Sequence, residues 1–209
     1  MSGLVLYDYW RSSAAYRVRI ALALKGLDWD SRPIDLAAGE QGHAEYLSRN
    51  PQGLVPALAV DGMLLTQSLA IIEYLEARWP QPALLPTDPA ERARVMAQAL
   101  LIAADTHPIQ NLRVLNYLRR EIGLEEPAVQ AWARHWIALG FATLEGQAPV
   151  AGLFGGASPN LADLCLVPQM ANARRFGVDL APFPRLERIY AALRQLPAFV
   201  RAAPEAARR

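Results

Sequence analysis

Strand-like segments are confined to the first third of this chain, and no convincing strand pattern follows residue 65. The Asp61-Gly62 pair stands between two short apolar runs, which is a strong signal for a β-hairpin. Helix-like patterns separate the other strand-like runs. The expected order is β-α-β-α-β-β-α, with elements at about residues 4–7, 13–25, 29–34, 43–47, 55–60, 63–65 and 69–79. This order predicts a mixed four-stranded sheet with helices packed on it.

The rest of the chain is expected to be all-helical, after a proline-containing linker at residues 80–86. Asp88-Pro89-Ala90-Glu91 is a capping box with proline at the first helical position, so a long helix should begin there. It can run to His107-Pro108, where the proline should kink or restart it. Later helices are expected up to residue 122, at 125–146, from 161, and at 184–196. The expected domains are an α/β domain at 1–82 and a helical domain at 88–209, with a frayed C-terminal tail.

Composition excludes several classes of function. The formal net charge is only +1, which gives no reason to expect a nucleic acid partner. The single cysteine, Cys165, excludes an internal disulfide framework, and three scattered histidines without a cysteine pair provide no metal site. No run approaches the length of a membrane span, and the very short apolar stretch before Asp8 is not a signal peptide. A cytoplasmic protein is expected.

Residues 12–22 read Ser-Ser-Ala-Ala-Tyr-Arg-Val-Arg-Ile-Ala-Leu. This segment resembles the pattern Ser-Ser-Cys-x-Trp-Arg-Val-Arg-Ile-Ala-Leu of the zeta-class glutathione transferase family, in particular its maleylacetoacetate isomerase branch. It is one of five segments that resemble this family. The others lie in order over nearly the whole chain, at residues 50–56, 67–75, 107–113 and 162–169.

The resemblance implies an architecture and a reaction. It implies a thioredoxin-like N-terminal domain that binds glutathione, a helical C-terminal domain that shapes the substrate pocket, and a homodimer. It also implies a glutathione-dependent isomerase that converts maleylacetoacetate to fumarylacetoacetate in tyrosine and phenylalanine catabolism. A thiolate adds to the conjugated alkene of this dicarboxylate keto-acid, the former double bond rotates, and the thiolate leaves.

Ser12 and Ser13 are the expected catalytic serines and also contact glutathione. The Ser12 hydroxyl can donate to the glutathione sulfur, and the positive end of a helix favours the thiolate. Serine at a helix start is also a common N-cap, so from position alone a purely structural role stays open. Ser13 is expected to support Ser12.

Two further pairs are expected to bind glutathione. Val55-Pro56 resembles the cis-proline turn of the family, which would present the Val55 backbone to the cysteinyl part of the tripeptide. Gln67-Ser68 precedes an amphipathic helix and would bind the γ-glutamyl end. Ser68 is also expected to cap that helix.

The remaining site residues rest mainly on the resemblance. Arg11 and Arg175 are expected to bind the carboxylates of the substrate through a guanidinium fork. His107, Asn111 and Arg113 lie around the helix break and would contact glutathione or substrate, partly across the dimer. For Arg11 and Arg175 the alternative is a surface charge, and for His107 it is a helix-end cap or an ordinary buried histidine.

One position departs from the family pattern, and three other polar or reactive residues have structural explanations. Ala14 occupies the position of the family's cysteine; because the attacking sulfur belongs to glutathione, isomerase activity is still expected. Maleylpyruvate isomerases also lack that cysteine, so maleylpyruvate isomerase and general transferase activity remain alternatives, together with a non-catalytic binding scaffold. Asn160 and Asp163 have the spacing of a capping box and are expected to be structural, as is Cys165.

Overall fold

The computed structural model describes residues 3–208 and divides the chain into two compact units. The first contains the residues up to Ala83 together with those from Gln195 onward, and the second is Leu84–Arg194. The C-terminal segment, which the sequence assigned to the helical domain, therefore belongs to the first unit. Within the described residues, no helix is both long and apolar enough to cross a membrane.

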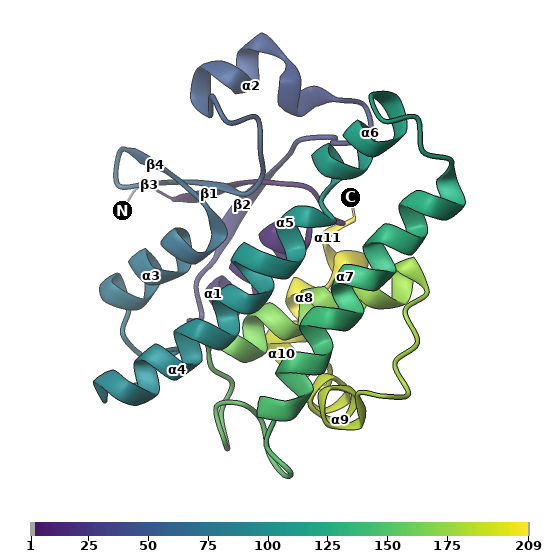
Figure 1. Cartoon of the computed structure of the whole chain (residues 1–209). Helices are drawn as coiled ribbons and strands as arrows, with labels where there is room; N and C mark the ends of the chain where they lie inside the picture. Colours follow the sequence, from purple (N-terminus) through teal and green to yellow (C-terminus); the bar gives the residue numbers. More distant parts are fainter. Residues whose placement is uncertain (1–2, 209) are drawn as a thin grey trace. The chain divides into compact units, whose positions relative to one another are not determined.

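The first unit is built on a mixed four-stranded sheet (Figure 1). Its strands lie in the order β2-β1-β3-β4, with bounds β1 Leu4–Asp8, β2 Trp29–Pro33, β3 Ala57–Val60 and β4 Met63–Thr66. β1 pairs in parallel with β2 and antiparallel with β3, which forms an antiparallel hairpin with β4. Asp61 and Gly62 both have positive φ at the hairpin turn, as the two-residue loop requires. The predicted element order and hairpin are confirmed.

Three helices lie between or directly after the strands of this sheet in the chain: α1 (Ser13–Leu24), α2 (Ala44–Arg49) and α3 (Ser68–Arg78). α1 and α3 contact each other. The middle of α1 is buried on all sides, and Arg17 and Arg19 are buried with its apolar side chains. A buried arginine is unusual and needs compensating partners, so both side chains are expected to form hydrogen bonds or ion pairs within the unit.

Within the first unit, Arg19 connects the C-terminal segment to the sheet and α1. Its Nη1 donates to both carboxylate oxygens of Asp8, at 2.7 and 2.8 Å, and its Nε donates to the carbonyl oxygen of Ala202 at 2.9 Å. Ala202 ends helix α10 (Pro197–Ala202), which contacts α1 and is followed by α11 (Pro204–Ala207). The predicted fraying is wrong for this segment, because α10 buries Phe199 and satisfies a buried arginine.

Lys25 holds the segment that follows α3. Its Nζ donates to Glu76 Oε2 at 2.7 Å and to the carbonyl oxygens of Trp79 and Pro82 at 2.6 and 3.1 Å. Carbonyl groups at a helix end have no partner within the helix, and a buried ammonium group supplies one. The expected linker is therefore tied to the first unit along its first residues.

The second unit consists of helices. Their bounds are α4 Pro89–Leu100, a π-helical segment Leu101–Thr106, α5 His107–Ile109, α6 Leu112–Arg120, α7 Glu126–Gln147, α8 Leu161–Phe176 and α9 Pro184–Leu193. Asp88 caps α4 by accepting from the backbone N–H of Glu91 at 2.9 Å, as predicted. The expected interruption near Pro108 is confirmed, and it has two parts: the π-helical segment before the proline and a break at Gln110 after it.

Gly140 permits α7 to approach the π-helical segment. A Cβ atom on Gly140 would lie 2.2 Å from Thr106 Oγ1, which donates to the Leu101 carbonyl at 2.9 Å. We expect Gly140→Ala to destabilise the protein by about 1–3 kcal/mol, although alanine is normally favoured over glycine within a helix by about 1 kcal/mol. Urea unfolding measures the change. The matched test is the same substitution in a Thr106→Ala background, where its cost should be clearly smaller; an equal cost would contradict the steric explanation.

Asp163 organises the start of α8, which is almost wholly buried. Asn160 and Asp163 form the predicted capping box. The Asp163 carboxylate also accepts from the backbone N–H groups of Phe154 and Gly155, at 3.1 and 2.9 Å, so it joins the preceding loop to the helix. Burial raises the pKa of Asp163 to about 6, and these backbone hydrogen bonds offset part of the rise.

This raised pKa makes stability depend on pH in a specific direction. The ordinary pKa of an aspartate is 3.8. At pH values between this and about 6, the folded protein holds a proton on Asp163, whereas the unfolded chain has released it. Stability contributed by this group therefore falls as pH rises through that window. We expect the stability difference between wild type and Asp163→Asn to shrink by about 2 kcal/mol from pH 4 to pH 7. Urea unfolding of both proteins across this range checks it, and a constant difference would contradict the raised pKa.

Candidate active site

Ser12 is the N-cap of α1. Its Oγ accepts a hydrogen bond from the backbone N–H of Ala15 at 3.2 Å, and its φ and ψ are those of extended backbone. Accepting this bond uses an oxygen lone pair and leaves the hydroxyl proton to donate elsewhere. The cap is therefore compatible with the predicted contact to a thiolate, which stays a prediction. Ser13 is the buried first residue of the helix.

The Val55–Pro56 peptide bond is cis, as the resemblance implied. The preceding residue is held firmly: the carbonyl oxygen of Leu54 accepts from Tyr46 Oη at 2.6 Å and from Asn50 Nδ2 at 2.8 Å. Tyr46 lies within α2, and Asn50 is the C-cap of that helix. This helix therefore positions the turn that leads into β3.

Ser68 is the first residue of α3, and the cap position is taken by Gln67, which makes no side-chain cap hydrogen bond. The predicted capping role of Ser68 is therefore wrong. Gln67 has φ +67°, which an L-residue other than glycine rarely adopts and which is typical of functional sites. Its side chain donates to Gln52 Oε1 at 2.8 Å.

Arg17 is a site residue that the sequence did not single out. It is 1% exposed, and its Nη1 donates to Ser68 Oγ at 3.3 Å. The contact joins the first turns of α1 and α3. The sequence signal that could have identified Arg17 is its position among apolar residues of a predicted helix. Only the fold identifies Ser68 as its partner.

The starts of α1 and α3 are both suited to anions. Neither helix has an acidic residue in its first turn, so the positive helix ends are not neutralised locally. Arg17 adds a buried positive charge beside Ser68. Together these groups can bind a carboxylate at α3 and favour an anionic sulfur at α1.

In the second unit, His107, Asn111 and Arg113 lie on both sides of the helix break, as predicted. His107 begins α5, and Asn111 caps α6 by accepting from the backbone N–H of Leu112 at 2.6 Å. Arg113 is exposed in the first turn of α6. The structure thus assigns Asn111 a helix-end role, and the ligand contacts of all three residues stay predictions.

The arginines near the end of α8 differ in their partners. Arg174 forms an ion pair with Glu187 at 2.5 Å, whereas Arg175 donates through Nη2 to Asn172 Oδ1. Arg175 and, in the first unit, Arg11 are both exposed, and Arg11 lies over the ring of Trp10 at 5.5 Å. The binding of a substrate carboxylate by Arg175 or Arg11 stays a prediction.

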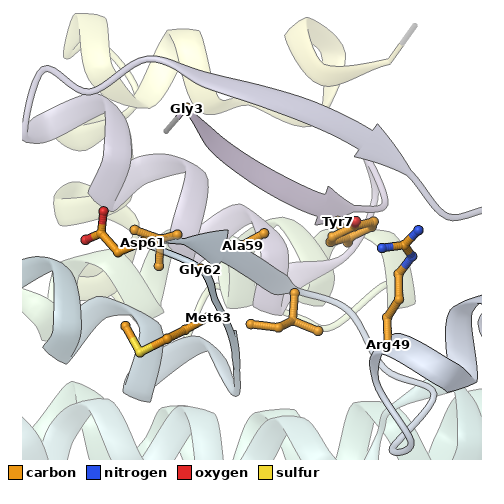
Figure 2. A pocket seen from close by; sticks show the side chains of 9 residues that line it. Gly3, Tyr7, Arg49, Ala59, Asp61, Gly62 and Met63 are labelled. Carbon is orange, nitrogen blue, oxygen red and sulfur yellow. The ribbon is translucent and has the colours of Figure 1, made fainter. Parts of the chain in front are cut away.

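A separate pocket of about 380 Å³ lies in the first unit, next to the β3–β4 hairpin (Figure 2). Tyr7, Arg49, Ala59 and Met63 are among its lining residues, and none of the predicted site residues is. Among the residues the structure describes, no group of three or more His, Cys, Asp or Glu side chains could hold a metal ion.

The sheet, the cis-proline turn and the two serine-bearing helix starts together define a glutathione transferase. Residues 2–77 match the family model described as the N-terminal domain of glutathione S-transferase. Maleylacetoacetate isomerase of Pseudomonas aeruginosa is 51% identical to the chain over 202 residues, which is 95% of each protein.

Solved structures of zeta-class proteins are also similar to this chain. A maleyl pyruvate isomerase described as a bacterial zeta-class transferase has a TM-score of 0.94 and 45% identity over 97% of both chains. Maleylacetoacetate isomerase of Anaeromyxobacter dehalogenans 2CP-1, with bound dicarboxyethyl glutathione and citrate, has a TM-score of 0.87 and 47% identity, covering 98% of this chain and 95% of that one. This chain therefore belongs to the zeta class of glutathione transferases, the family of the maleylacetoacetate isomerases.

Proposed function

We propose that this protein is a glutathione-dependent cis–trans isomerase that converts maleylacetoacetate to fumarylacetoacetate. The glutathione thiolate adds to one alkene carbon, and the electron pair of the double bond moves to the adjacent carbonyl as an enolate. The former double bond then rotates, the enolate re-forms the alkene, and the thiolate leaves unchanged. No oxidant or reductant is needed, and glutathione is regenerated.

The observation that carries this proposal is the pair of helix starts in the first unit that bear Ser12 and Ser68 and have no acidic residue in their first turns. The Ser12 hydroxyl and the N-terminal end of α1 would keep the sulfur anionic; an ordinary thiol has a pKa of about 8.5 and is mostly protonated at neutral pH. Ser68 and Gln67 would hold the γ-glutamyl end at α3. The backbone of Val55 would pair with the cysteinyl part beside the cis-proline.

Residues outside these helix starts would serve the substrate. Arg175 and Arg11 are the proposed ligands for its carboxylates, and His107, Asn111 and Arg113 would contact substrate or glutathione. The bound dicarboxyethyl glutathione of the Anaeromyxobacter relative supports this chemistry, because it has the composition of a thiol added across a four-carbon dicarboxylic alkene. We further propose a homodimer in the cytoplasm, where glutathione is kept reduced.

Maleylpyruvate is the second candidate substrate, which the similarity to maleyl pyruvate isomerase and the alanine at position 14 both favour. A spectrophotometric assay of both substrates, with and without glutathione, separates the candidates. We expect turnover only with glutathione and a higher kcat/KM for maleylacetoacetate. Equal rates without glutathione would refute the mechanism, and a higher kcat/KM for maleylpyruvate would reassign the substrate.

A further inference from the structure

Arg175 is the first member of a chain of buried polar side chains in the second unit. It donates to Asn172 Oδ1; Asn172 Nδ2 donates to Gln110 Oε1 at 2.6 Å; and Gln110 Nε2 donates to Gln169 Oε1 at 3.3 Å. Asn172, Gln110 and Gln169 are 5%, 2% and 0% exposed. Three buried amides in contact are uncommon in a helical core, because each must find partners to offset its desolvation.

The direction of this chain follows from the chemistry of Arg175. A guanidinium group can only donate hydrogen bonds, so Asn172 must turn its oxygen toward it. The Asn172 amide nitrogen then faces Gln110, which must present its own oxygen, and the same step repeats at Gln169. The orientation of every amide is therefore set by the single charged group at the end.

The chain also connects two elements of the second unit. Gln169, Asn172 and Arg175 are three residues apart on α8 and so share a face of the helix. Gln110 lies at the break between α5 and α6, and α7 supports this break because Trp132 Nε1 donates to the Ile109 carbonyl at 2.8 Å. The position of Arg175 is thus coupled to the segment that carries His107 and Asn111.

Stability alone does not account for this arrangement. Among the described residues, Gln169 Nε2 is buried and has no acceptor, which costs free energy that an apolar side chain would avoid. In addition, the contact that Asn172 makes with Arg175 is through a neutral amide. An amide fixes the guanidinium without adding a negative charge that would compete with an anionic ligand.

We propose that Asn172 is a positioning residue that orients Arg175 toward a carboxylate of the dicarboxylate substrate, with Gln110 and Gln169 fixing the orientation of Asn172. This inference rests on the proposed function, because it assumes that Arg175 binds the substrate. It assigns no chemical step to the amides. Their role is to hold the guanidinium fork in one direction before the substrate arrives, which reduces the entropy lost on binding.

The test uses Asn172→Ala and the isosteric Asn172→Asp in the full-length protein loaded with glutathione. We expect Asn172→Ala to raise KM for the isomerised substrate, and Kd for malonate by calorimetry, about tenfold, with kcat and glutathione affinity nearly unchanged. Asn172→Asp should weaken malonate binding further, because its carboxylate competes for Arg175. Arg174→Ala is the matched control and should leave both constants unchanged.

Several outcomes would overturn the inference. Unchanged malonate affinity in Asn172→Asp would do so even if Asn172→Ala failed to fold, and an equal loss of glutathione affinity would show a general structural effect. The proposed function fails separately if the wild-type protein isomerises neither substrate. Loss of malonate binding in Asn172→Asp would still support the positioning role in that case.

Discussion

Ser12→Ala is expected to lower isomerase turnover about 10²–10³-fold, the usual cost of removing one hydrogen-bond donor from a developing or stabilised anion. The structure provides the reason. Ser12 Oγ already accepts from Ala15 N–H, so its proton is available to the glutathione sulfur at the start of α1. Without that donor the pKa of the bound thiol should rise, and less thiolate is present at neutral pH. Measuring turnover against pH reports both effects.

Ser12→Thr is the control, because threonine keeps the hydroxyl and remains an acceptable N-cap. It should retain most of the activity. Loss of the cap in Ser12→Ala should cost about 1 kcal/mol of stability, too little to unfold a typical protein, so thermal unfolding separates the two effects. Wild-type turnover in Ser12→Ala, with an unchanged pH profile, would remove Ser12 from the mechanism.

Arg19→Leu is expected to destabilise the protein by about 3–5 kcal/mol. The substitution leaves the Asp8 carboxylate, only 2% exposed, without its arginine partner, and it also removes the donor to the Ala202 carbonyl. An uncompensated buried charge is more costly than the ion pair was favourable. Denaturant unfolding at neutral pH measures the loss.

The double variant Asp8→Asn, Arg19→Leu is the control for this explanation. It removes the buried charge together with its partner, so it should be more stable than Arg19→Leu alone. A double variant as unstable as the single one would assign the cost to packing or to the lost contact with α10. Arg19→Leu within 1 kcal/mol of wild type would contradict the importance of the ion pair.

Most of the fold could be predicted because its signals are local. Asp61-Gly62 allows a tight hairpin, the Asn160–Asp163 spacing encodes a capping box, and Pro89 suits the first turn of a helix. The C-terminal segment could not be predicted in this way. The sequence of this segment shows no strong helical periodicity. Its position depends on a hydrogen bond between Arg19 and Ala202, which are far apart in sequence.

The features of the candidate site likewise divide into those that local sequence predicts and those that depend on tertiary structure. Ser12 at a helix start and the cis-proline turn were predictable from the residues and the family resemblance. The positive φ of Gln67, which shifts Ser68 from the cap into the helix, was not, because glutamine carries no preference for that conformation. The contacts of Arg17 with Ser68 and of Gln110 with Asn172 join residues more than 50 positions apart, and only tertiary structure brings them together.

The packing of α10 against α1 has a consequence for biosynthesis. The ribosome makes the sheet and α1 first, but the helix that completes their surroundings is encoded at the opposite end of the message. While the second unit is being translated, the guanidinium of Arg19 therefore lacks the Ala202 carbonyl as an acceptor. The first unit is therefore complete only once α10 has been made, and a nascent chain stopped at the linker would hold an incomplete version of it.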